Sequence, residues 1–116
     1  MDVEILGYGI YIPQYRIKVA EIASIWGKDV TAIERSLGVK EKSVAAQDED
    51  TVTMSFEAAF LALQRACLPP SAVDICFVGS ESHPYAVNPT STIVAEFLGV
   101  GRNYLSVDLE FACKAA

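Results

Sequence analysis

The sequence is poor in the residues that build metal and disulfide sites. Among its 116 residues are three cysteines and a single histidine, His83. The cysteines, at positions 67, 76 and 113, are odd in number and form no C-x-x-C pair. A structural zinc site usually has four cysteine or histidine ligands, often arranged in such pairs. The composition therefore argues against a structural zinc site and favours a reduced, cytoplasmic protein.

Long apolar runs and basic clusters are also missing. No run approaches the roughly 20 apolar residues that span a bilayer. The first residues, MDVE, are acidic where a secretory signal is basic. The nine lysines and arginines are scattered and the formal net charge is −6, so no electrostatic footprint for nucleic acid or an anionic membrane is visible. These absences favour a soluble domain, in which a local pocket could still bind an anionic ligand.

The chain is rich in apolar residues, which make up 52% of it and are enough for a packed core in a single domain. The patterns predict strands over residues 3–12, 72–78 and 104–109, helices over 18–26, 29–37, 50–67 and 90–98, and an extended segment over 39–46. Strands that alternate with helices indicate an α/β fold with a largely parallel sheet.

Cys113 lies in the stretch EFACKAA, just after the strand predicted over residues 104–109. At the start of a following helix, free backbone N–H groups and the helix dipole would favour a thiolate. Small neighbouring side chains would let an acyl group approach the backbone. The alternative is a buried structural cysteine, which is a common role for this residue. Cys67 and Cys76, inside a predicted helix and strand, are interpreted as structural.

Glu81 lies in the stretch GSES, directly after the strand predicted over residues 72–78. α/β folds place ligands and catalytic groups at the carboxyl ends of their strands, and a half-buried carboxylate there could act as acid and base. The alternative is a solvated loop glutamate. His83 is interpreted as a surface residue, or one that supports a site without reacting. The run QDEDT is interpreted as a turn and helix cap rather than a metal site.

Four segments of the chain, taken together and in order, resemble the N-terminal third of the hydroxymethylglutaryl-CoA synthases in their shorter archaeal form, within the thiolase superfamily. The segments are GYGIYIPQYRI at 7–17, EDTVTMSFEAA at 49–59, VGSES at 78–82 and DLEFACKAA at 108–116. The resemblance implies the N-terminal part of a thiolase-like fold, with a mostly parallel or mixed sheet and helices on both faces. Residues 1–116 would form the first half of that fold, cut off after the nucleophilic cysteine.

The resemblance also implies a reaction, in the mevalonate route to isoprenoids. Cys113 would take the acetyl group of acetyl-CoA as a thioester, and Glu81 would remove a proton from the acetyl methyl group. The carbanion equivalent would attack acetoacetyl-CoA, and water would release 3-hydroxy-3-methylglutaryl-CoA. Asp29 and Val30 would contact the substrate or its CoA. The family's catalytic histidine lies far downstream, so His83 does not match it, and no metal or cofactor besides the CoA substrates is implied.

Members of the family are about three times as long as this chain. We therefore expect a fragment, a truncated gene product or one subunit of a split enzyme, inactive until a C-terminal half or a second chain completes the site. The resemblance also implies a homo-oligomer. Archaeal relatives associate with acetoacetyl-CoA thiolase through a small zinc-containing OB-fold protein, and the same partners are implied here.

Two alternative functions remain open at this point. Ketoacyl-acyl-carrier-protein synthases of the third type share the fold and the cysteine, but they use histidine and asparagine rather than a glutamate after the preceding strand. Glu81 in GSES argues against them. The second alternative is a non-catalytic thiolase-like scaffold that binds acyl-CoA or a partner enzyme.

Overall fold

A computed structural model describes residues 2–111, which fall into two units. The larger unit combines the residues up to Tyr11 with those from Glu49 onward, and the smaller unit is Ile12–Asp48. Among the described residues, no helix is long and apolar enough to cross a membrane.

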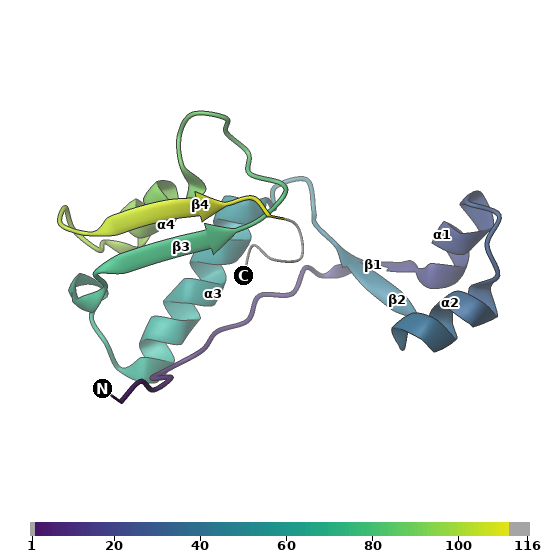
Figure 1. Ribbon diagram of the computed structural model, residues 1–116, viewed down its shortest axis with the longest axis horizontal. Helices are drawn as coiled ribbons and strands as arrows, with labels where there is room; N and C mark the ends of the chain where they lie inside the picture. The colour runs from purple at the N-terminus through teal and green to yellow at the C-terminus, as the bar shows by residue number, and fades with distance from the viewer. Residues whose placement is uncertain (1, 112–116) are drawn as a thin grey trace. The chain divides into compact units, whose positions relative to one another are not determined.

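The larger unit contains two helices and a parallel pair of strands (Figure 1). Its elements are helix α3 (Thr51–Ala66), a 3₁₀ turn (Pro70–Ala72), strand β3 (Ile75–Gly79), helix α4 (Thr90–Leu98) and strand β4 (Leu105–Leu109). The register runs from Ile75 opposite Leu105 to Gly79 opposite Leu109. Because α4 is the crossover between two parallel strands, the carboxyl ends of β3 and β4 meet at the same edge.

Local sequence sets the start of α3 and the end of α4. The Asp50 side chain accepts from the backbone N–H of Thr53, and the Thr53 hydroxyl accepts from the backbone N–H of Asp50, which forms a capping box at the start of α3. Helix α4 ends at Gly99, whose φ of 77° lies in the left-handed region that glycine adopts without a steric penalty.

The core of the larger unit lies between the strands and the two helices. Val78, Val94, Ala95 and Val100 are buried there, and α4 packs on β3, on β4 and on α3. Successive strand residues point to opposite faces. Ile75 and Phe77 therefore lie on the other face of the pair, where they are more than half exposed.

The smaller unit is an antiparallel strand pair with two short helices. Strand β1 (Tyr15–Lys18) pairs with β2 (Glu41–Val44), and helices α1 (Val19–Ile25) and α2 (Val30–Leu37) lie between them in sequence. Val19 and Ala23 are its buried apolar side chains. Helix α2 ends at Gly38, with a φ of 68°.

The strand predicted over residues 3–12 is wrong: residues 2–13 form no strand, and the first strand of the described chain begins at Tyr15. The segment instead lies along α3. A Cβ on Gly9 would come 1.9 Å from the carbonyl oxygen of Ala58, and one on Gly7 would come 2.6 Å from that of Ala62. Its large apolar side chains stay exposed, among them Ile5 at 89% and Ile10 at 61%, so the glycines rather than the apolar pattern make the close approach to α3. The other predicted helices, strands and extended segment are found within a few residues of their expected bounds.

This close approach predicts that Gly9→Ala destabilises the protein. The added methyl group would meet backbone atoms of α3, so the segment must move, at a cost of about 1–3 kcal/mol in the free energy of unfolding. Denaturant unfolding measures the loss. Val3→Ala is the control in the same segment, because Val3 is 88% exposed. Equal unfolding midpoints for the two variants would contradict the packing of this segment on α3.

Candidate functional site

Glu81 lies where two parallel strands end. It comes two residues after Gly79, the last residue of β3, and the backbone N–H of Ser80 still donates to the carbonyl of Leu109, at 3.0 Å. Leu109 is the last residue of β4. Glu81 is an exposed residue of the loop that follows. The structure thus puts Glu81 at the carboxyl edge of the strand pair, as the sequence predicts.

Cys113 lies outside the described residues. It follows the end of β4 by four positions in the chain. Its predicted role as nucleophile therefore stays a prediction.

The start of the loop after β3 is attached to the first residue of α3. The Thr51 hydroxyl donates to the carbonyl of Ser82 at 2.8 Å and lies 3.2 Å from the Ser80 hydroxyl. The backbone N–H of Ser82 in turn donates to the Ser80 hydroxyl at 3.0 Å. These three contacts fix the backbone on both sides of Glu81.

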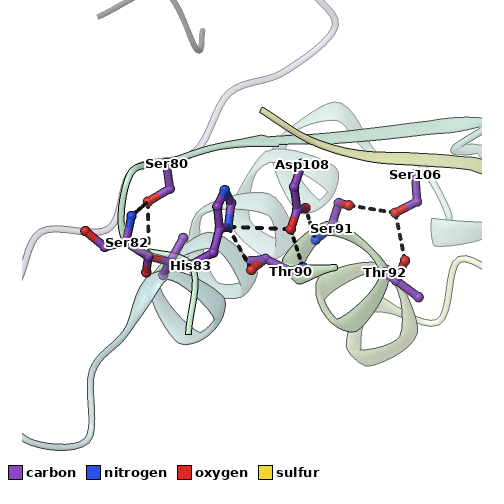
Figure 2. A network of polar contacts seen from close by, with 9 residues as sticks. Ser80, Ser82, His83, Thr90, Ser91, Thr92, Ser106 and Asp108 are labelled. Carbon is purple, nitrogen blue, oxygen red and sulfur yellow. Dashed lines mark hydrogen bonds and ion pairs between the residues drawn. The ribbon is translucent and has the colours of Figure 1, made fainter. Parts of the chain in front are cut away.

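The His83 side chain is buried, so the first of its two interpretations, a surface residue, is wrong and the second, a supporting residue, stays open. Only 3% of its side chain is exposed. Its Nδ1 atom lies 2.8 Å from the Thr90 hydroxyl and 3.6 Å from a carboxylate oxygen of Asp108, and Figure 2 shows the imidazole between Ser80 and Asp108. The Nε2 atom is buried and has no hydrogen-bond partner within residues 2–111. The sequence shows this histidine only as an isolated residue before a proline.

Asp108, on β4, joins the strand to the beginning of α4. Its two carboxylate oxygens accept from the backbone N–H groups of Thr90 at 2.6 Å and Ser91 at 2.8 Å. Helix α4 starts after Pro89, whose side chain cannot accept a hydrogen bond, so Asp108 does the work of an N-cap from another element. Sequence reasoning missed this residue. The one signal was an aspartate within the otherwise apolar end of a predicted strand.

The environment of Asp108 favours its charged form. Burial by itself raises the pKa of this carboxyl group. The hydrogen bonds from the backbone and hydroxyl of Ser91 and the backbone of Thr90, with the nearby His83, outweigh burial and lower the pKa below its ordinary value. A carboxylate held in this way is a fixed negative charge at neutral pH.

A group of hydroxyls continues the network along α4 (Figure 2). The Ser106 hydroxyl lies 2.7 Å from that of Ser91 and 2.9 Å from that of Thr92. Thr90 and Ser91 are fully buried. Their polar atoms are therefore satisfied inside the protein, as buried polar groups require.

Cys76 fits the structural role expected for it. Burial, and then the nearby negative charge of Asp108, raise the pKa of the Cys76 thiol, so the unreactive protonated form is favoured. Cys67 is the residue that ends α3, with a φ of 54°. Within the described part of the chain, no three histidine, cysteine or acidic side chains gather as metal ligands.

Asp29 and Val30 belong to the smaller unit, at the start of α2. The Asp29 carboxylate accepts from the backbone N–H groups of Thr31 at 2.9 Å and Ala32 at 3.4 Å. Asp29 is therefore the N-cap of α2. Val30, the first helical residue, is half-buried. Their predicted contact with a substrate stays a prediction.

Comparison with known proteins confirms the resemblance found in the sequence. The chain is 57% identical to the hydroxymethylglutaryl-CoA synthase of Archaeoglobus fulgidus and 60% identical to that of Methanothermobacter thermautotrophicus. Each match extends over 111 residues, which are 96% of this chain and 32% of the relative. The chain thus spans about a third of the length of the relatives that it matches. No protein-family model matches the chain.

Solved structures confirm the α/β, thiolase-like fold. The chain superposes on 3-oxoacyl-[acyl-carrier-protein] synthase III from Aquifex aeolicus with a TM-score of 0.85, at 25% identity, over 98% of this chain and 36% of the other. It superposes on MvaS in complex with 3-hydroxy-3-methylglutaryl coenzyme A with a TM-score of 0.83, at 25% identity, over 99% of this chain and 28% of the other. Both neighbours have the thiolase fold.

The contacts of Asp108 predict that Asp108→Asn destabilises the protein in a pH-dependent manner. The side-chain amide of this variant keeps one acceptor oxygen for the backbone N–H groups of α4 and places its own N–H groups against them. The change should cost about 1–2 kcal/mol in the free energy of unfolding near neutral pH. A lowered pKa in the folded state means that the carboxylate stabilises above its unfolded pKa, and that this stabilisation is lost as the pH falls through the folded pKa. The difference from the wild type should therefore shrink below about pH 4.

Denaturant unfolding at a series of pH values measures this difference. Asp74→Asn is the matched control, because Asp74 is an exposed aspartate of the same unit. A difference from the wild type that stays constant from neutral pH to pH 2–3, well below the ordinary pKa of about 3.9, would contradict the role of the Asp108 charge.

Proposed function

We propose, from the match to archaeal hydroxymethylglutaryl-CoA synthases over nearly the whole chain, that these residues are the N-terminal part of such an enzyme. The complete protein condenses acetyl-CoA with acetoacetyl-CoA and water to give 3-hydroxy-3-methylglutaryl-CoA and free CoA. The enzyme is an acyltransferase that needs no metal or cofactor besides its CoA substrates.

In the first half-reaction the Cys113 thiolate attacks the carbonyl carbon of acetyl-CoA. The C–S bond to CoA breaks, CoA leaves as its thiolate, and Cys113 holds the acetyl group as a thioester. A thiolate suits this step because it is both a good nucleophile and a good leaving group.

In the second half-reaction Glu81 removes a proton from the acetyl methyl group. The carbanion equivalent attacks the C3 ketone of acetoacetyl-CoA, and the new alkoxide takes a proton. Water then hydrolyses the thioester, which frees the Cys113 thiol and releases the product. Abstraction of so weak an acid needs a well-placed base and stabilisation of the enolate oxygen, to which the backbone N–H of Cys113 can contribute.

The observation that supports this proposal is the parallel pairing of β3 and β4. Gly79 is opposite Leu109, Glu81 follows the first strand by two positions, and Cys113 follows the second by four. The two strands that lead to these chemically complementary residues thus end at the same edge. This edge is where α/β folds assemble their sites.

The remaining assignments extend the proposal to the whole protein. The MvaS neighbour holds 3-hydroxy-3-methylglutaryl coenzyme A, which supports acyl-CoA substrates here, with Asp29 and Val30 as contacts. We place the enzyme in the cytoplasm, in the mevalonate route to isoprenoids. Its proposed partners are further copies of itself, acetoacetyl-CoA thiolase and a small zinc-containing OB-fold protein.

Substitutions of Glu81 and Cys113 separate the two half-reactions in the complete protein. Glu81→Ala should abolish condensation but leave acetylation of Cys113 by labelled acetyl-CoA intact, because only the second step needs the carboxylate. Cys113→Ala should remove the label altogether. Intact-mass and product assays measure both steps. Unchanged condensation in Glu81→Ala would favour a ketoacyl-carrier-protein synthase, and an unlabelled wild type would favour a non-catalytic scaffold.

Two substitutions of Asp29 separate its proposed substrate binding from its capping role. Ser is an equally good N-cap, so Asp29→Ser keeps α2 while it removes the carboxylate. We expect the KM for the acyl-CoA substrate to rise about tenfold, the loss of one charged hydrogen bond. Asp29→Ala, which also removes the cap, should lower the melting temperature as well. A wild-type KM for Asp29→Ser would show that Asp29 only caps the helix.

A further inference from the structure

Residues 80–89, between β3 and α4, contain no helix or strand, yet this loop carries Glu81. A catalytic base must be held within a fraction of an ångström of its productive position, and loops hold that precision only when other contacts fix them. The bonds between Thr51, Ser80 and Ser82 fix the loop to α3. The backbone N–H of Ser80 also donates to the carbonyl of Leu109, which fixes the first residue of the loop to β4, the strand that leads to Cys113. The loop residues after Ser82 need a further contact on that side.

His83 supplies the contact on that side. Its imidazole, 97% buried, lies against the Thr90 hydroxyl at 2.8 Å and against Asp108 of β4 at 3.6 Å. Thr90 is itself fully buried at the first turn of α4. A single ring thus connects the Glu81 loop to both the helix and the strand that follow it (Figure 2).

The groups that hold the ring are themselves fixed. Asp108 accepts two backbone N–H groups of α4, and its backbone is paired with β3 opposite Val78. A carboxylate and a hydroxyl on one side of the ring suit a proton on Nδ1, since the carboxylate can only accept. In this tautomer the Nδ1–H group makes the connection.

We propose that His83 is a positioning residue for the condensing base. Through Nδ1 it holds the loop against Thr90 and Asp108, and so sets the place of Glu81 relative to the segment that leads to Cys113. The role rests on the proposed function. It predicts that loss of the Nδ1 contact impairs condensation, which uses Glu81, and spares acetylation of Cys113, which does not.

Two substitutions of similar size test the two imidazole nitrogens separately. The side-chain amide of His83→Asn can occupy the place of Nδ1, and that of His83→Gln the place of Nε2. We expect His83→Asn to keep most of the wild-type kcat for condensation. His83→Gln and His83→Ala should lose on the order of tenfold to a hundredfold, the effect of a misplacement near 1 Å, with acetylation of Cys113 unchanged.

A second pair of variants tests the same contact from its other partner and leaves His83 in place. Thr90→Val removes the hydroxyl, whereas Thr90→Ser keeps it. Thr90→Val should lower kcat for condensation in the same direction as His83→Gln, and Thr90→Ser should resemble the wild type. Val87→Ala, at a position that is 89% exposed in the same loop, is the control for substitutions in the loop.

Amide hydrogen exchange gives a readout that does not depend on activity. The amide of Ser82 should exchange faster in His83→Gln and Thr90→Val than in His83→Asn, Thr90→Ser and the wild type. If the wild-type protein does not condense its substrates, the proposed function fails, and this exchange pattern still decides the positioning role.

Three results would overturn the inference. One is wild-type condensation and exchange in His83→Gln and Thr90→Val. Another is a higher activity of His83→Gln than of His83→Asn, which would assign the role to Nε2. The last is an equal loss of condensation in all His83 variants without any change in exchange, which would make the imidazole a reacting group.

Discussion

The Asp108 carboxylate is the interaction on which the site edge of the larger unit depends. It accepts the first two free N–H groups of α4, a task that a helix usually gives to the side chain just before it. Here Pro89 occupies that position. The capping group comes instead from β4, a strand that follows the helix in the chain. One carboxylate therefore fixes the start of α4 against β4 and also offers an oxygen to His83.

This arrangement has an electrostatic consequence. The Asp108 carboxylate faces the positive end of the α4 dipole. Its partial burial raises its pKa, but the hydrogen bonds from Ser91 and Thr90, with the nearby His83, outweigh burial and keep it ionised. Burial, and then this charge, raise the pKa of Cys76, which lies on the neighbouring strand two residues before the position opposite Asp108. Both effects favour the protonated, unreactive form of the Cys76 thiol.

Much of the fold could be predicted because its signals are local. The Asp29 and Asp50 caps and the glycines that end α2 and α4 all depend on residues within a few positions of one another. The strand predicted over 3–12 failed for the opposite reason. Its β-branched and aromatic residues favour an extended backbone, but that backbone lies on α3, where Gly7 and Gly9 permit a close approach. The residue propensities indicate an extended backbone but do not indicate which element that backbone packs on.

The candidate site likewise combines features with local signals and features without them. Glu81 could be placed at the carboxyl edge from the sequence, since a parallel strand order already implies that edge. The His83–Thr90–Asp108 contacts could not, because they join residues up to 25 positions apart whose types suggest nothing singly. An aspartate in an apolar strand and a histidine in a polar loop each have an ordinary explanation. Only the fold brings the two within 3.6 Å of one another.

Fold similarity alone does not select the chemistry. The superposition on a carrier-protein synthase is as good as that on MvaS, and both share 25% of their residues with this chain. What differs between the two proposed chemistries is the group that takes the proton, and a carboxylate performs that task only if the loop that carries it holds still. A condensing glutamate at position 81 therefore needs residues 80–83 to be anchored. Thr51 and His83 anchor that segment from opposite ends, while Glu81 between them stays exposed to solvent at the edge of the strand pair.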